Sequence, residues 1–217
     1  MVRREAFVDA AMRLVQLRGY EQTSIQDVLD ELDASRGAFY HYVDSKQELL
    51  EAMVDRIADQ ALASLGPIVE DGRLPANLKL ERFFSGIGQW KTERKALMLE
   101  LIKVWLSDDN AIVREKVRRV MVERIAPILA AIIRQGIAEE VFVAESPEET
   151  ARVLMTLLQG FQDTATGLYV GRQNGIVSYD DVQRRLQGFT RAFERVLGAP
   201  PGSVKPIDEN IMREWFG

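Results

Sequence analysis

Apolar residues recur along the chain at three- and four-residue spacing, and few segments alternate at a spacing of two. This period is that of one buried face of an α-helix, so the pattern predicts helices throughout. Near the start, Ala6, Ala10 and Leu14 belong to one such face, which ends at Gly19. Glycine takes the left-handed conformation that closes a helix without a steric penalty, so Gly19 is the predicted stop.

Helix start signals divide the rest of the chain. A hydroxyl residue followed three positions later by Glu or Gln can cap a helix, and Thr23 with Gln26 and Ser45 with Glu48 have this spacing. Two glycines and two prolines within residues 66–76 predict a connector there. Together with the apolar period, these signals predict helices over 23–32, 35–42, 45–64, 76–91, 93–106, 109–138, 147–170, 179–198 and 208–216.

The first fifty residues have the layout of a helix-turn-helix unit. Three helices are expected there, and the second and third are joined by a very short turn. Such a unit lays its recognition helix in the major groove of DNA. In the helix expected over 35–42, Ala38 and Phe39 can pack inward, and Gly37 removes a side chain where a backbone must approach closely.

Composition excludes several classes of site. The 217 residues include no Cys and one His, so disulfides, thiolate nucleophiles and multi-histidine metal sites are excluded. We expect no cofactor and no metal, and an enzyme is disfavoured, although a site built from carboxylates alone stays open. No apolar run is long enough for a membrane span, and the first residues lack the apolar core of a secretory signal. A soluble, cytoplasmic protein without a membrane partner is expected.

The charge balance does not favour binding to a nucleic acid. The net charge is -5, and residues 1–50 carry 6 basic against 9 acidic side chains, a net of -3. DNA binding would therefore rest on local geometry rather than on a basic domain. Asp27, Asp30, Glu31 and Asp33 would repel phosphate, so we expect them to face away from DNA.

Residues 23–50 read TSIQDVLDELDASRGAFYHYVDSKQELL. A threonine helix start, a small-Gly-x-aromatic-Tyr-x-aromatic run and a Ser-Lys-x-Glu-Leu segment make this stretch resemble the TetR family of transcriptional regulators. The resemblance covers residues 4–55 and extends further only through helix number and length; Val43 stands where phenylalanine is common. It implies an all-α fold of about nine helices, with a helix-turn-helix DNA-binding domain over 1–50, a linking helix over 45–64, and an effector-binding and dimerisation domain over 51–217.

The resemblance also implies a function. The chain would be a repressor that binds a pseudo-palindromic operator as a homodimer and is released by a small-molecule effector. The alternative is a helical interaction protein of the same fold that does not read DNA, which the acidic first fifty residues favour. The change Arg36→Ala discriminates between them, since it should relax specificity only in a DNA reader.

Family roles carry over to nine positions at the predicted DNA interface. Hydroxyls at a helix start hold phosphate, the first residues of the recognition helix reach base edges, and a lysine after that helix binds phosphate. Simpler interpretations stay open for five of these residues. Thr23 can be a helix cap only and Tyr40 can be partly core, and Arg36, His41 and Lys46 can be ordinary structural or solvated side chains. The residues are Thr23, Ser24, Ser35, Arg36, Gly37, Tyr40, His41, Tyr42 and Lys46.

The middle helices resemble the family's effector-binding region. Apolar walls with few polar anchors are typical of small-ligand pockets, although such residues at helical spacing also make plain core. Glu100 interrupts an apolar run; it either pairs with Lys103 on the surface or points inward, which would favour a cationic effector. The predicted pocket residues are Phe83, Phe84, Ile87, Trp90, Met98, Leu101, Trp105, Met121, Ile125, Met155, Gln159 and Gln162.

The last two long helices would form the dimer interface according to the resemblance. Periodicity alone equally allows their apolar stripes to serve only the subunit's own core. The predicted interface residues are Leu154, Leu158, Phe161, Leu168, Val182, Leu186, Phe189 and Phe193.

Overall fold

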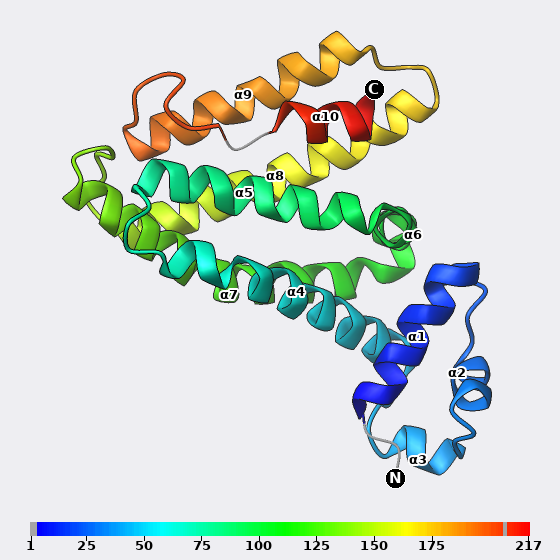
Figure 1. Cartoon of the computed structure of the whole chain (residues 1–217). Coiled ribbons are helices and arrows are strands. Elements are labelled where there is room, and N and C mark those ends of the chain that lie inside the picture. Colours follow the sequence, from blue (N-terminus) through cyan, green and yellow to red (C-terminus); the bar gives the residue numbers. More distant parts are fainter. Residues whose placement is uncertain (1–3, 206–207) are drawn as a thin grey trace. The chain divides into compact units, whose positions relative to one another are not determined.

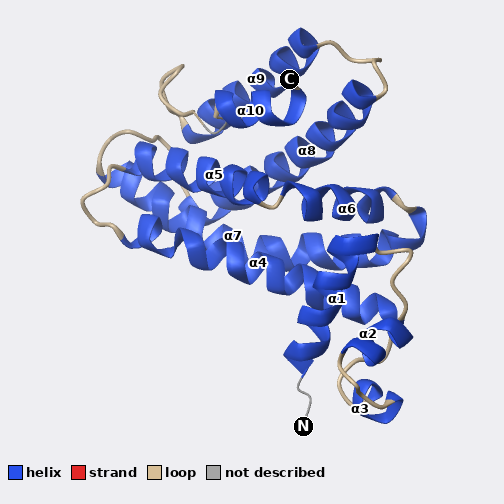
Figure 2. Ribbon diagram, turned by 45° about the vertical axis from the view of Figure 1, so that its right-hand side comes forward, coloured by secondary structure: helices blue, strands red, loops and turns tan. Residues whose placement is uncertain are grey.

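The computed structural model describes residues 4–205 and 208–217, which form helices and connecting loops with no strand (Figures 1 and 2). The predicted all-α fold is confirmed, with ten α-helices in these ranges where about nine were expected. None of these helices has the length and apolar composition of a membrane span. They are α1 (Arg4–Arg18), α2 (Ile25–Glu31), α3 (Arg36–Tyr40), α4 (Lys46–Glu70), α5 (Ala76–Glu93), α6 (Lys95–Leu106), α7 (Ala111–Ala138), α8 (Pro147–Gln173), α9 (Tyr179–Leu197) and α10 (Glu209–Phe216), with a 3-10 turn, η1 (Asp108–Asn110).

The chain divides into two compact units that are not continuous in sequence. The first unit contains Met1–Leu62 and Arg94–Arg119, and the second contains Ala63–Glu93 and Val120–Gly217. The whole of α6 therefore belongs with the first three helices. The predicted functional boundary at residue 50 stays a prediction, because compactness alone does not assign function.

The first unit is built around aromatic and branched side chains of the helix-turn-helix segment. Phe7 of α1 and Phe39 of α3 are fully buried, and their rings meet edge to face with centroids 5.3 Å apart. Val28 of α2 lies in the same core. Val104 and Val113, from α6 and α7, complete it, so residues far along the chain stabilise the helix-turn-helix segment.

The second unit contains the pairing of α8 with α9 and the packing of α10 on α5 and α8 (Figure 1). Phe84 of α5 contacts Phe193 of α9, with ring centroids 5.7 Å apart. Gly88 brings α5 close to α10, because a Cβ at this position would lie 2.8 Å from the Ile211 side chain. The Trp215 indole donates a hydrogen bond of 2.7 Å to the Thr92 hydroxyl and fixes α10 in place.

Helix bounds agree with the sequence prediction to within about three residues except at the end of α4. The connector predicted over 66–76 is wrong in its first half, because α4 continues through Gly66 and Pro67 to Glu70. Two tertiary contacts explain this. Leu65 is buried against Gly86 of α5, and the Lys79 ammonium donates to the Val69 carbonyl in the last turn of α4.

The predicted cap at the start of α2 is also wrong by one residue. Ser24 is the N-cap, its hydroxyl accepts from the Asp27 N–H, and the Asp27 carboxylate accepts from the Ser24 N–H at 2.7 Å. Thr23 is buried, and its hydroxyl donates to the Gly19 carbonyl at 2.8 Å. Gly19 has φ +89° and ends α1 as predicted.

Candidate nucleic-acid interface

The orientation of α3 is set by one buried ring. The Ser35 hydroxyl caps the helix by accepting from the Ala38 N–H at 3.2 Å. Phe39 is buried against Phe7, and this anchors one side of α3 in the core. Arg36 and Gly37 then lie exposed to solvent together with Tyr40. The structure thus brings the predicted base-reading residues together on an accessible surface.

Arg36 is held by a neighbour that the sequence did not single out. Its Nη2 donates to Gln26 Oε1 at 3.2 Å, and Gln26 Nε2 donates to Asp30 Oδ1 at 2.7 Å. The amide places the guanidinium without neutralising it, because an amide oxygen has no net charge. The guanidinium therefore remains a charged, exposed group that can pair with a base edge. No local motif signals this contact, since the two residues are ten positions apart.

The three aromatic residues that follow differ in exposure. Tyr40 is 51% exposed while its ring meets Phe39 edge to face. His41 is exposed as well, and it lies just after α3, at the C-cap. Tyr42 is partly buried and contacts Phe7, with centroids 6.4 Å apart. Tyr40 and His41 are thus available to a large partner, whereas Tyr42 also supports the core.

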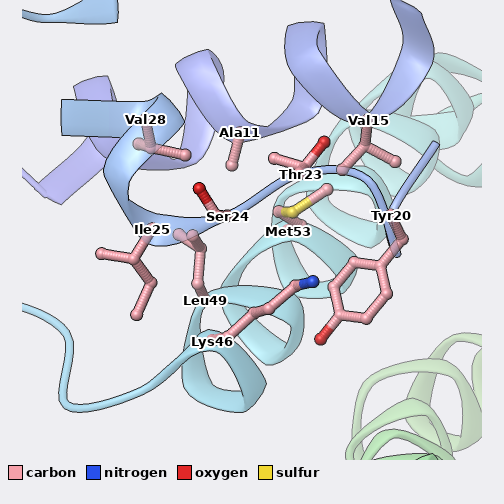
Figure 3. A pocket seen from close by; sticks show the side chains of 10 residues that line it. All are labelled: Ala11, Val15, Tyr20, Thr23, Ser24, Ile25, Val28, Lys46, Leu49 and Met53. Atoms are coloured by element: carbon pink, nitrogen blue, oxygen red, sulfur yellow. The ribbon is translucent and has the colours of Figure 1, made fainter. Parts of the chain in front are cut away.

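Lys46 occupies a more enclosed position than expected. Its Nζ lies 4.3 Å from the centroid of the Tyr20 ring, at the edge of a hollow between α1, α2 and α4 (Figure 3). The hollow measures about 10 Å³, room for no more than a water molecule. Burial, with a smaller effect of Glu21, raises the Tyr20 pKa to about 12. A phosphate would therefore compete with the Tyr20 ring for the ammonium.

The acidic residues of α2 are partly neutralised by arginines of α1. Arg18 Nη2 lies 3.1 Å from Asp27 Oδ1, and Arg13 Nη2 lies 2.6 Å from Glu31 Oε1. Asp30 and Glu31 are exposed and Asp27 is partly buried, while their orientation relative to DNA stays a prediction. Hydrogen bonds from the Ser24 hydroxyl and N–H, together with Arg18, hold the Asp27 pKa below its usual value. These pairs reduce the negative field beside the candidate interface.

The predicted effector residues are distributed over both compact units. Those of α6 lie in the first unit, and those of α5, α7 and α8 lie in the second. Glu100 is paired with Lys103 at 2.5 Å, so the surface interpretation of this acid is confirmed and the argument for a cationic effector falls. The buried members are Phe83, Phe84, Trp90, Met98 and Met155; Ile87, Leu101, Trp105, Met121, Ile125 and Gln159 are partly buried, and Gln162 is exposed.

The predicted dimer residues separate into two groups. Five are buried within the subunit and serve its own core: Leu154, Leu168, Val182, Leu186 and Phe193. Leu158, Phe161 and Phe189 keep partial exposure, and the rings of the last two meet edge to face with centroids 5.5 Å apart. Only the second group leaves apolar area available for a partner subunit.

Two family models match the chain. The model described as bacterial regulatory proteins, tetR family, matches residues 7–53. The model described as tetracyclin repressor-like, C-terminal domain, matches residues 95–174, and the two matches together take in more than half of the chain. The chain belongs to the tetR family of bacterial regulatory proteins.

Solved structures share the fold of this tetR-family chain. A TetR transcription regulator from Haloarcula marismortui superposes with a TM-score of 0.61 over 90% of this chain and 96% of its own, at 22% identity. A transcriptional regulator from Cytophaga hutchinsonii gives a TM-score of 0.59 over 98% of both chains, at 18% identity. At these identities the likeness establishes the fold alone.

Curated relatives of this family member are named as regulators. One from Lactococcus lactis, described as an uncharacterized HTH-type transcriptional regulator, is 42% identical over 52 residues, which are 24% of this chain and only 26% of the relative. YfiR from Bacillus subtilis is 26% identical over 62% of this chain and 67% of its own length. DhaR from a Mycobacterium species, named a transcriptional repressor, is 20% identical over 72% of this chain and 79% of its own length.

Proposed function

We propose that this chain is a transcriptional repressor that binds a pseudo-palindromic DNA operator as a homodimer and is released by a small-molecule effector. The observation that carries the proposal is the amphipathic split of α3. Phe39 fixes the helix to the core while Arg36, Tyr40 and His41 stay exposed. A short helix held rigidly by one face, with a guanidinium on the other, is the arrangement that reads a major groove.

Dimerisation follows from the size of this interface. A single helix-turn-helix unit buries little DNA surface, so such units act in pairs on half-sites about 34–36 Å apart. The partly exposed Leu158, Phe161 and Phe189 of α8 and α9 supply an apolar surface for the second subunit. The name of DhaR supports repression as the direction of control.

Regulation would operate by a shift in the relative populations of different arrangements of the subunits. An effector that binds one arrangement of the subunits better than another favours that arrangement by its difference in affinity. If that arrangement changes the spacing of the two α3 helices, DNA affinity falls, and DNA weakens effector binding by the same factor. We propose that the protein has neither catalytic activity nor a cofactor, because its relatives are named regulators. We further propose that it acts in the cytoplasm, where its operator would lie.

The test is capture of sheared genomic DNA by the full-length protein at fixed salt, followed by sequencing of the retained fragments. Salt is held constant because phosphate contacts make affinity steeply salt-dependent. The expected result is one or a few enriched regions that share an inverted repeat. Uniform retention, or no retention, would refute specific DNA reading and favour the helical interaction protein.

A pair of variants sharpens this test. Arg36→Ala should weaken binding to the recovered repeat by roughly 5- to 150-fold while leaving binding to random DNA nearly unchanged. Arg73→Ala is the matched control, because Arg73 is 94% exposed in the other compact unit and pairs with Asp71. Equal loss of specific and random binding in Arg36→Ala would contradict a base-reading role.

A further inference from the structure

Two long helices of this chain run through both compact units. α4 and α7 each begin in the first unit and end in the second, because the boundaries fall after Leu62 and after Arg119. α4 follows α3 in the chain, and α7 contributes Val113 to the core of the first unit. The ends of these helices in the second unit, residues 63–70 and 120–138, are thus continuous with helix turns that belong to the unit containing α3.

Lys79 of α5 joins the second-unit ends of α4 and α7 to each other. Its side chain is 4% exposed, and its ammonium donates to the Val69 carbonyl of α4 at 2.9 Å and to Gln135 Oε1 of α7 at 2.8 Å. Hydrogen bonds from a charged donor are roughly twice as strong as those between neutral groups. One buried side chain therefore fixes the end of α4 relative to the end of α7.

The Gln135 amide is oriented by its other partners. Its Nε2 donates to the Leu74 carbonyl at 2.8 Å and to Glu139 Oε1 at 2.6 Å. An amide nitrogen has two N–H donors, so both are used and the oxygen is left to accept from Lys79. Glu139 Oε2 also accepts from the Ala76 N–H at 2.8 Å, where α5 begins. The end of α7 is thereby held at both the start of α5 and Lys79.

A buried polar network of this kind specifies a geometry. Apolar side chains of similar volume often give equal or greater stability than a buried charged network, so stability alone does not require one. Hydrogen bonds fix both a distance and a direction. We propose that Lys79 is a positioning residue that ties α4 to α7, and that this tie sets how strictly the dimer requires one separation between its operator half-sites. This inference rests on the DNA-reading homodimer proposed above.

A second contact between the same two helices supplies a matched control. Lys116 Nζ of α7 lies 2.8 Å from Glu51 Oε1 of α4, and both residues belong to the first unit. The Lys116 side chain is 50% exposed, and an ion pair in contact with water restrains its partners weakly. Lys116→Met therefore removes a lysine contact between α4 and α7 without disturbing the buried tie.

Operators with altered spacing test the proposal. One inserted base pair turns the second half-site by about 35° and moves it by about 3.4 Å, since about 10–10.5 base pairs make one turn of 34–36 Å. The full-length wild type, Lys79→Met, Gln135→Leu and Lys116→Met are titrated at fixed salt with three DNAs. These are the recovered operator, the operator with one base pair inserted at its centre, and a single half-site. Met keeps the length of the lysine side chain without its charge.

The wild type should bind the inserted operator at least about tenfold more weakly than the natural one, because a dimer of fixed geometry cannot engage both half-sites. In Lys79→Met and Gln135→Leu this ratio should fall by at least about threefold, because α4 and α7 can then shift separately and let α3 reach the displaced half-site. The half-site Kd should be the same in all four proteins. Lys116→Met should match the wild type on every DNA.

Three results would overturn the proposal. They are a wild-type ratio in Lys79→Met, a wild type that binds both operators equally, and an equal loss on all three DNAs, which reports damage to the DNA-reading unit itself. If Lys79→Met does not fold, Gln135→Leu decides alone, because there Lys79 keeps its bond to Val69 and only the tie to α7 is lost.

Hydrogen exchange separates the tie from the proposed function. Amide hydrogens of residues 66–70 in α4 and 132–138 in α7 should exchange at least about fivefold faster in Lys79→Met than in the wild type, and at wild-type rates in Lys116→Met. Unchanged exchange in Lys79→Met would overturn the tie. If no protein is retained on DNA, the proposed function fails and the spacing role falls with it, whereas faster exchange would still establish the tie.

Discussion

Replacing Gly136 of α7 by alanine tests how closely this helix packs against the Phe142 ring. A Cβ at this position would lie 2.6 Å from Cε2 and 2.8 Å from Cγ of Phe142, and closer still to Cδ2. Favourable contacts between carbon atoms lie near 3.5–4.0 Å, so the ring would have to move by more than about an ångström. It has little freedom to do so, because Phe142 is 2% exposed and the Val141 and Phe142 N–H groups both donate to the Gly136 carbonyl.

Two opposing terms decide the effect of Gly136→Ala. Alanine in place of glycine inside a helix gains up to about 1 kcal/mol. Displacing the Phe142 ring costs an amount that approaches its complete removal, about 3–5 kcal/mol. The clash term is the larger, so the free energy of unfolding should fall by roughly 2–4 kcal/mol.

Urea unfolding at fixed protein concentration measures this change. Gly188→Ala is the matched control, because Gly188 is exposed in α9 and a Cβ added to it would meet no atom within 4 Å. It should stabilise the protein by about 0.5–1 kcal/mol. In Phe142→Ala, which removes the ring, adding Gly136→Ala should cost nothing further. A Gly136→Ala variant as stable as Gly188→Ala would refute the reasoning.

Three further predictions concern the first unit. Ser24→Ala should lower the free energy of unfolding by about 1 kcal/mol, read from urea curves, because it removes the N-cap of α2. Hydrogen bonds from Ser24 lower the Asp27 pKa, so the ionised carboxylate stabilises the folded state above about pH 4. This stabilisation is lost as the pH falls through the lowered pKa. Asp27→Asn should therefore flatten the acid part of a plot of unfolding free energy against pH. Burial raises the Tyr20 pKa to about 12, so the folded state keeps a proton that the unfolded state loses near pH 10, and stability should drop between about pH 10 and 12. Tyr20→Phe should remove that alkaline drop, and an unchanged profile would contradict the burial argument.

The fold was largely predictable because its signals are local. The apolar period predicted the helices, Gly19 has the positive φ that ends α1, and the Ser45 hydroxyl accepts from the Glu48 N–H at 3.1 Å as the start signal indicated. The errors arise where contacts with residues distant in the sequence determine where a helix ends. Nothing between residues 64 and 76 reveals that Lys79 will stabilise the last turn of α4.

The exposure of part of the candidate site was predictable, and its contacts were less so. The motif around Arg36 contains the exposed Gly37 and Tyr40, whereas the predicted Thr23 is buried, and the support from Gln26 depends on how α2 crosses α3.

The membership of α6 in the first unit bears on how this protein could be re-engineered. The helices that would read DNA share their core with Val104 and Val113, so this module is interrupted in sequence by the whole of α5. A chimera that transplants residues 1–50 as a cassette would set those valines against a foreign surface. Exchange of operator specificity between relatives should therefore succeed when the segment 94–119 is transplanted along with the helix-turn-helix, and should yield poorly folded hybrids when it is left behind.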